Sequence, residues 1–412
     1  MKVSGMQDMP IGERIRLYRR RRGLSQPRLA QLIGRSESWL SQVERGVRSV
    51  DRFSTIIELA RVLQVQVVDL TGRPLSLAPN GGAHLEAVDA LRRSLMSYSA
   101  IPAALDMGEE PRRRPDLGRL RRTVVMANEL YQAGSYSGAG ELLPGAIVDA
   151  QAASRELRGD DRQAAFRILA ETYHITAKSL TKVSETELAW IAAERALAGA
   201  ERAEAPLLVG ASAYHIGHAF LRAGRNREAT ALTMEATAAL APTRDAEPER
   251  LALWGALHLT ALFGAARGSD RRGADQLLDE AERTAERLGD ERNDFWFAFG
   301  PTNVRIHAVA LAVEVGDPDE TIRLGESLDT SRLPAGVRGR RSAVLIDLAR
   351  GYAMRRMDAA AVNTLLDAEQ VAPEAVRFNV IVHEQLRELL KREHRASTPQ
   401  LRPLAERAGV LS

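Results

Sequence analysis

Pairs of alanines seven residues apart recur along the C-terminal three quarters of this 412-residue chain. Seven residues span about two turns of an α-helix, so both alanines of a pair lie on one face and let a neighbouring helix approach closely. Most successive pairs begin about 40 to 50 residues apart, the spacing of a repeated helical hairpin. The pairs are Ala139/Ala146, Ala189/Ala196, Ala229/Ala236, Ala274/Ala281 and Ala361/Ala368. The pattern predicts a stack of helical hairpins.

Two segments resemble tetratricopeptide repeats: ASAYHIGHAFLRAGRNREATALTMEATAALAP and IDLARGYAMRRMDAAAVNTLLDAEQVAP. Their consensus positions hold Gly217, Phe220, Gly224, Ala229 and Ala236 in the first, and Tyr352, Ala361, Ala368 and Pro373 in the second. We expect five or six hairpins between about residues 118 and 393, followed by a capping helix in STPQLRPLAERAGVLS. A curved stack of this kind presents a groove that binds peptides or small molecules, or mediates dimerisation.

The composition excludes several classes of protein. The chain has no cysteine, which removes disulfides and thiolate metal sites. No run of eighteen apolar residues is present, and the first residues have no apolar segment of signal-peptide length. We therefore expect a cytoplasmic, nucleoid-associated protein that does not contact membrane.

Positive charge is concentrated at the N-terminus. Residues 1–72 contain 13 basic and 7 acidic residues, a net charge of +6, so the remaining chain carries −3 of the total of +3. Five helices are predicted in this region, over 11–22, 26–33, 36–45, 51 or 52–63, and 66–70. A small basic domain joined to a large, mildly acidic one suggests that the former binds a polyanion.

The break between the second and third of these helices is the most informative. Gly34 stands where a tight turn needs a positive φ, and Ser36 is a suitable N-cap for the helix that follows. Leu40 and Val43 are spaced to pack back onto the preceding helix. Two helices crossing through a short glycine turn are a helix-turn-helix.

Residues 10–72 resemble the phage-repressor-type (XRE) helix-turn-helix regulators. The resemblance is carried by the LSQ entry, the LAQLIG helix, the S…S…ERG helix and the following IIELARVL. It implies a five-helix, lambda-repressor-like domain that binds an operator in double-stranded DNA. In this family the second helix of the motif lies in the major groove.

The resemblance also implies roles for individual side chains. Base-reading positions fall on Arg35, Ser36, Glu37, Ser38 and Gln42; Gln42 would bond an adenine edge and Glu37 a cytosine amine. Phosphate-binding positions fall on Gln26, Arg45, Arg48 and Arg52. Glu44 would pair with Arg19 as a structural salt bridge, and we expect Trp39 to pack against the first helix rather than to contact bases.

We expect three sequence regions in an all-α protein. Residues 1–72 form the helix-turn-helix domain. Residues 73–118 form a linker with one embedded helix, in which Leu85, Val88, Leu91 and Leu95 share a face. Residues 119–412 form a tetratricopeptide-like α-solenoid that senses a signal and dimerises the chain.

One stretch departs from the repeat pattern. Residues 293–317 contain a cluster of aromatic residues, a Gly-Pro interruption and two polar residues four apart. A ligand pocket here would be lined by Trp296, Phe299, Asn303 and His307. The alternative is a packed hairpin corner, with Asn303 capping a backbone group and His307 satisfied in the core.

No residues are predicted to be catalytic, to hold a cofactor or to bind a metal. His215 and His218 are three apart and His174 and Tyr214 are expected near them, but a third metal ligand is missing. The sequence therefore predicts a transcriptional regulator rather than an enzyme. It would be a homodimer on a palindromic operator, controlled by a peptide or small metabolite in the solenoid groove. The alternative is an adaptor whose repeats recruit a partner protein to DNA.

Overall fold

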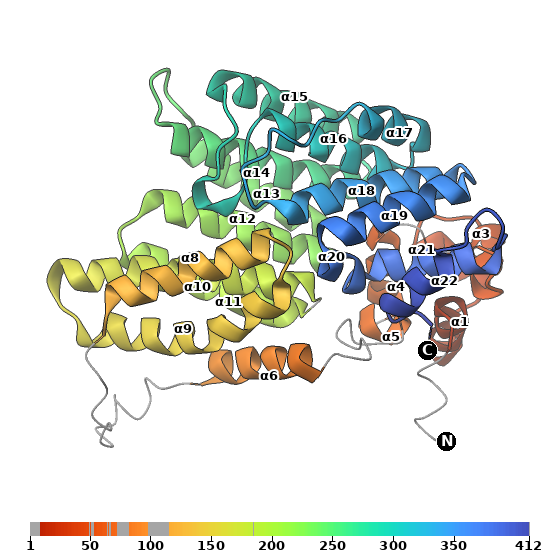
Figure 1. Ribbon diagram of the computed structural model, residues 1–412, viewed down its shortest axis with the longest axis horizontal. Coiled ribbons are helices and arrows are strands. Elements are labelled where there is room, and N and C mark those ends of the chain that lie inside the picture. Colours follow the sequence, from red (N-terminus) through yellow and green to blue (C-terminus); the bar gives the residue numbers. More distant parts are fainter. Residues whose placement is uncertain are drawn as a thin grey trace. The chain divides into compact units, whose positions relative to one another are not determined.

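A computed structural model describes residues 9–48, 50, 53–63, 65, 67–71, 82–97, 115–183 and 185–411. Within these ranges the regular secondary structure is helical, without a β-strand (Figure 1). The sequence prediction of an all-α chain, with helix-turn-helix helices followed by helical repeats, is confirmed.

The helices form two compact units. The terminal unit contains residues 1–81, 305–328 and 341–412, and the central unit contains residues 82–304 and 329–340. The N-terminal helices thus belong to the same compact unit as the last helices of the chain. Sequence regions and compact units do not coincide, because packing between distant segments defines the units.

The N-terminal part of the terminal unit holds five helices. They are α1 (Ile11–Arg21), α2 (Gln26–Leu32), α3 (Glu37–Glu44), α4 (Phe53–Leu63) and α5 (Val67–Thr71). The predicted helices agree with these to within one or two residues at each end. Their shared core includes the fully buried Ile15, Leu29 and Leu40.

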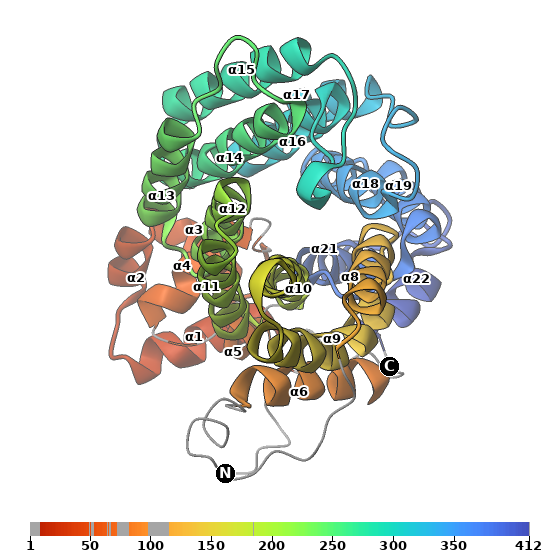
Figure 2. The ribbon, with the colours of Figure 1, turned by 90° about the vertical axis from the view of Figure 1, so that its left-hand side faces the viewer.

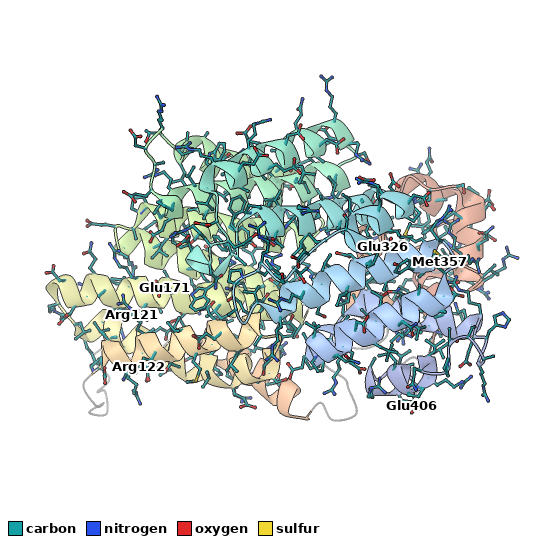
Figure 3. All side chains as sticks on the ribbon, turned by 45° about the horizontal axis from the view of Figure 1, so that its top comes forward. Arg121, Arg122, Glu171, Glu326, Met357 and Glu406 are labelled. Atoms are coloured by element: carbon teal, nitrogen blue, oxygen red, sulfur yellow. The ribbon has the colours of Figure 1, made fainter. Side chains whose placement is uncertain are left out.

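The C-terminal part of the same unit continues the helical repeats. Its helices are α17 (Pro318–Glu326), α18 (Arg338–Met354, of which residues 341–354 lie in this unit), α19 (Asp358–Val371), α20 (Pro373–Arg377), α21 (Val380–Lys391) and α22 (Leu401–Arg407). Tyr352 on α18 donates to the carboxylate of Glu326 on α17 at 2.6 Å. Glu326 is labelled in Figure 3. Val380 and Ile381 at the start of α21 belong to the same apolar cluster as the core of α1–α5. Helices α1–α5 therefore pack against the start of α21.

The central unit begins with α6 (Gly82–Met96), the helix within the linker region. Val88, Leu91 and Leu95 are buried as expected, whereas the side chain of Leu85 lies outside the described residues. Four hairpins follow: α8 (Leu117–Gln132) with α9 (Tyr136–Glu156), α10 (Gly159–Lys182) with α11 (Thr186–Arg202), α12 (Pro206–Arg222) with α13 (Asn226–Ala239), and α14 (Pro248–Arg267) with α15 (Arg271–Leu288). These helices follow one another along a curved row (Figure 2).

The alanine pairs lie at the contacts between these helices. The second helix of each hairpin carries them, and every member except the partly buried Ala236 is buried. A short 3-10 turn, η2 (Asp294–Trp296), comes next, and α16 (Pro301–Val315) begins in the central unit and continues into the terminal one.

Candidate functional site

The turn between α2 and α3 has the geometry that its sequence predicts. Gly34 has φ +60°, a conformation that glycine adopts without steric cost. The hydroxyl of Ser36 accepts from the backbone N–H of Trp39 at 3.1 Å and so caps α3. Ser25 caps α2 in the same way, accepting from Arg28 at 3.3 Å. Both helices of the motif therefore begin at a side-chain cap.

The angle of α3 is held by contacts with α1. A Cβ atom on Gly12 would lie 2.0 Å from the carbonyl oxygen of Val43, so the two helices meet backbone to backbone at this point. Beside this contact, Arg19 forms a two-point ion pair with the buried carboxylate of Glu44. The predicted structural salt bridge between these residues is present, whereas the sequence reading did not identify the close approach at Gly12.

Three of the five predicted base-reading residues form an exposed edge. Ser36, Glu37 and Ser38 stand at the N-terminal end of α3 and are exposed. Arg45 and Arg48, two predicted phosphate-binding residues, are also exposed and follow the other end of α3. A helix with exposed polar groups at its N-terminus and cations beyond its C-terminus has the chemistry of a helix that binds in the major groove of DNA.

The other two base-reading candidates are half-buried. The guanidinium of Arg35 lies over the Trp39 ring at 5.4 Å and is 3.5 Å from the hydroxyl of Thr55. Gln42 lines a cavity within the terminal unit. Trp39 is 7% exposed and belongs to the domain core, as expected.

The other two predicted phosphate-binding residues, Gln26 and Arg52, are not placed like the exposed Arg45 and Arg48. Gln26 donates its side-chain N–H to the carboxylate of Glu44 at 2.7 Å, so it joins the network that fixes α3. Arg52 lies outside the described residues. The contact between Gln26 and Glu44 joins residues 18 positions apart, which explains why no local pattern revealed it.

The central unit contains a second polar cluster, centred on Lys178 of α10. The ammonium group donates to the side-chain oxygen of Asn128 at 2.8 Å and lies 5.3 Å from the centre of the Tyr131 ring. Burial and, to a smaller extent, the nearby Arg340 lower the pKa of Lys178 to about 7. No acidic residue in the described part of the chain forms an ion pair with it. A half-buried cation without a counterion favours the approach of an anion.

Histidines extend this cluster. The ring nitrogen of His174 is 2.8 Å from the hydroxyl of Ser212, and its ring centre is 4.7 Å from that of His215. Burial lowers the pKa of His174 to about 3 and that of His215 well below its ordinary value. Both rings are therefore neutral near pH 7. The grouping of His174, Tyr214, His215 and His218 agrees with the sequence prediction.

A strained segment borders the same unit. Gln132 of α8 and Asn293 exchange two side-chain hydrogen bonds, at 2.8 and 2.9 Å. After Asn293, the residues Phe295, Trp296 and Ala298 all have positive φ, which is unfavourable for residues other than glycine. The backbone oxygen of Trp296 accepts from Gln132 at 3.3 Å, so the strained segment is held by α8.

The predicted ligand pocket of this segment can be placed residue by residue. Trp296 is half-buried, and Phe299 is fully buried against Gly255 in the apolar cluster of α12, α14 and α15. Asn303 and His307 are buried on α16, but the boundary between the units falls between them, so the first lies in the central and the second in the terminal unit. Their shared pocket remains a prediction.

The described residues were also considered as metal ligands and as membrane-spanning helices. No group of three or more histidine, cysteine or acidic residues there is arranged to hold a metal ion. None of the helices in the described ranges combines the length and apolarity needed to cross a membrane.

The comparisons with known proteins agree with the geometry of α1–α5. The profile of the family described as "Helix-turn-helix domain" matches residues 10–71. This segment is a helix-turn-helix domain. The match covers the five N-terminal helices and ends with α5.

Two further proteins are similar to parts of the chain. The HTH-type transcriptional regulator SlrR of Bacillus subtilis (strain 168) is 40% identical over 60 residues, which is 15% of this chain and 40% of SlrR. The chain thus matches less than half the length of this relative. The crystal structure of Bacillus thuringiensis PlcR, in complex with the peptide PapR7 and DNA, superposes with a TM-score of 0.36 at 14% identity, over 86% of this chain and 99% of that one.

Proposed function

We propose that this protein is a sequence-specific DNA-binding transcriptional regulator whose helical repeats bind a signal. The observation that carries the proposal is the exposed edge of α3 within a helix-turn-helix domain. Ser36, Glu37 and Ser38 offer hydrogen-bonding groups to base edges, and Arg45 and Arg48 offer cations to the backbone. Base contacts of this kind select the sequence, and phosphate contacts set the register.

The rigidity of the motif supports this function. Reading base edges requires a helix whose side chains are held in one orientation. The Arg19–Glu44–Gln26 network, the Gly12 contact and the Ser36 cap fix α3 in the domain, and the Ser25 cap fixes the start of α2. An adaptor that used this domain only for nonspecific localisation would need the positive charge but not the fixed helix.

The operator would be palindromic and the active species a homodimer. One α3 covers a single half-site, and two-fold symmetric proteins place their reading helices one helical turn apart, about 34 Å, or a multiple of it. The helical repeats would supply the dimer contact.

The signal would carry a negative charge. Lys178 has no acidic partner in the described part of the central unit; it donates to Asn128, and the neutral His174, one helical turn away on α10, contacts the hydroxyl of Ser212. A peptide carboxylate or an anionic metabolite supplies the missing counterion. Binding there would shift the population of two repeat-domain conformations, and hence the spacing of the DNA-reading helices.

Genome-wide mapping of bound DNA, followed by binding measurements on the recovered sites, tests the proposal. We expect one palindromic motif that the full-length protein binds at least a thousandfold more tightly than random duplex. Equal affinity for the motif and for scrambled duplex at low salt would refute sequence-specific regulation.

A further inference from the structure

The terminal unit contains a cavity of about 400 Å³. It lies between the segment from the end of α3 to Val50 on one side and α18, the α18–α19 turn and α21 on the other. Its volume falls in the range of pockets that hold small molecules, about 300–1,000 Å³. The helix-turn-helix domain contributes Gln42 and Arg48 to the wall, and α21 contributes Gln385.

The amide of Gln385 is unsatisfied in this wall. The residue is 9% exposed, and neither its side-chain oxygen nor its side-chain nitrogen has a hydrogen-bond partner among the described residues. Leaving both amide atoms unpaired is costly, because each loses its hydrogen bonds to water on burial. A ligand that presents an acceptor beside a donor would pair both atoms at once.

The charges of the wall do not balance. Its two acids already face cations, since Glu384 pairs with Arg387, and Glu388 lies 3.6 Å from Arg392 and 3.7 Å from Lys391. Arg350 and Arg392 likewise pair with Asp347 and Asp358, respectively. In contrast, Arg48 and Arg356 form no ion pair with a described residue. The cavity therefore retains two guanidinium groups for an anion, and guanidinium binds carboxylate and phosphate well.

The backbone at Arg356 supports a role for its side chain. Arg356 has φ +61° in the three-residue turn that joins α18 to α19. Glycine holds the same place in the turns of two other hairpins, as Gly134 and Gly224. Ser269 shows that glycine is not obligatory there. Arg356 takes a conformation that is unfavourable for residues other than glycine, and its side chain lines the cavity.

We propose that this cavity binds a small organic anion that also carries an amide-type donor–acceptor edge. The anionic group would lie between Arg48 and Arg356, and the edge would pair with Gln385. Two kinds of molecule share this chemistry: a nucleotide, through its phosphate and base, and the C-terminal end of a short peptide, through its carboxylate and last amide. Because Gln42 and Arg48 are also predicted DNA contacts, an occupant would engage side chains that α3 needs for its operator.

Calorimetric titration and thermal shift of the full-length protein, without DNA, test the site directly. The probes are the four common ribonucleoside monophosphates, each beside its uncharged nucleoside, and trialanine beside its C-terminal amide. We expect one charged class to bind at least tenfold more tightly than its neutral counterpart. Failure of every charged probe to bind, or equal binding of charged and neutral partners, would overturn the proposal.

Two variants locate the binding. Gln385→Met keeps the volume but removes the amide, and Arg356→Gly removes the guanidinium while favouring the left-handed turn. Each should weaken binding of the active probe at least tenfold without lowering the melting temperature. Arg355→Ala, an exposed neighbour that pairs with Asp319 outside the cavity, is the matched control and should bind as the wild type does.

The outcome is independent of the proposed regulatory function, because no DNA is present. Undiminished binding in both cavity variants would overturn the assignment. Loss of binding in Lys178→Met together with retention in Gln385→Met would instead place the anion in the central unit, and would also overturn it.

Discussion

Arg19 on α1 holds Glu44 at the end of α3 through two hydrogen bonds, 2.5 Å from Nε to Oε1 and 2.8 Å from Nη2 to Oε2. Gln26 at the start of α2 donates to the same carboxylate at 2.7 Å. One buried acid thus ties together α1, α2 and α3, the helices that position the proposed DNA-reading edge. Hydrogen bonding to Glu44 raises the pKa of Arg19, so its guanidinium remains charged.

Replacing one partner of this pair should cost more than replacing both. Arg19→Met leaves the Glu44 carboxylate buried without its main counterion, which typically costs about 3–5 kcal/mol. Arg19→Met/Glu44→Leu removes both charges and should recover most of that loss. Native-state hydrogen exchange of the amides in α1–α3 measures the local free energy of opening. A double variant as unstable as the single one would show that the pair is not the source of the loss.

Two glycines in the motif should differ in their tolerance of alanine. Gly12→Ala places a methyl group against the Val43 carbonyl and should push α1 from α3, at about 2–3 kcal/mol. Gly34→Ala meets no atom within 4 Å and should cost only the left-handed backbone penalty, about 1 kcal/mol. Thermal unfolding of both variants tests the order. If Gly34→Ala were the more damaging, the close crossing would not control the motif.

Gln42 and Arg45 should affect DNA binding in different ways. Gln42→Ala should cost about 1–3 kcal/mol at one base pair of the operator and relax specificity there. Arg45→Ala should lower affinity for all sequences and make the slope of log affinity against log salt shallower by about one unit. Anisotropy titrations on a set of single-base operator variants, at several salt concentrations, distinguish these effects. A uniform loss for Gln42→Ala would contradict base reading.

The buried histidines of the central unit should make the protein sensitive to acid. The pKa of His174 is about 3 in the folded chain, below its ordinary value of 6.5, because burial disfavours the charged ring. The unfolded chain therefore takes up a proton first, so the stability contributed by the neutral ring is present above pH 6.5 and is lost as pH falls toward 3.

The slope of unfolding free energy against pH should reach about 1.4 kcal/mol per pH unit for each such histidine. His174→Gln retains a partner for Ser212 but cannot titrate, so it should flatten the slope between pH 6 and 4. Denaturant unfolding at successive pH values measures this. An unchanged slope would mean that other groups dominate acid sensitivity.

Lys178 should lower the stability of the fold when it is charged, although the same charge favours binding of an anion. Its folded pKa of about 7 lies below the ordinary 10.5, so burying the charged form destabilises the fold below pH 7, and this penalty is relieved as pH rises toward 10.5. Lys178→Met should therefore raise the unfolding free energy, by more at pH 6 than at pH 10.

The same titration should govern the proposed signal. Affinity for an anionic ligand should fall as pH rises through about 7, where Lys178 loses its proton, and Lys178→Met should abolish this dependence. Calorimetric titrations with the natural signal between pH 6 and 8 provide the measurement. Stability gained in Lys178→Met without any loss of signal binding would indicate a purely structural lysine.

Local patterns were sufficient to predict the elements. Gly34 predicted the turn and Ser36 predicted the N-cap of α3, because a positive φ and helix capping depend on a few neighbouring residues. The alanines seven apart marked the close face of each second repeat helix, because helical periodicity is itself local. For the candidate DNA interface, the resemblance to XRE regulators implied the base-reading positions on α3, of which Ser36, Glu37 and Ser38 are exposed and Arg35 and Gln42 are half-buried.

The remaining parts of the sites depended on pairs distant in sequence. Lys178 meets Asn128 across 50 positions, and Gln132 meets Asn293 across 161. The sequence assigned no role to Gly12 and a phosphate contact to Gln26, and the contacts of both residues with α3 became visible only in the folded domain. No periodicity or spacing encodes such contacts, since they form only when the helices have stacked.

The order of residues by itself determined that this chain is helical and where the helices of the motif begin and end, because these properties arise from interactions within a few turns. Only the tertiary structure decided which polar side chains are buried next to one another and lose their hydration. Desolvation depends on every segment that surrounds a group, and it is this that leaves Lys178 without a counterion and Gln385 without a partner.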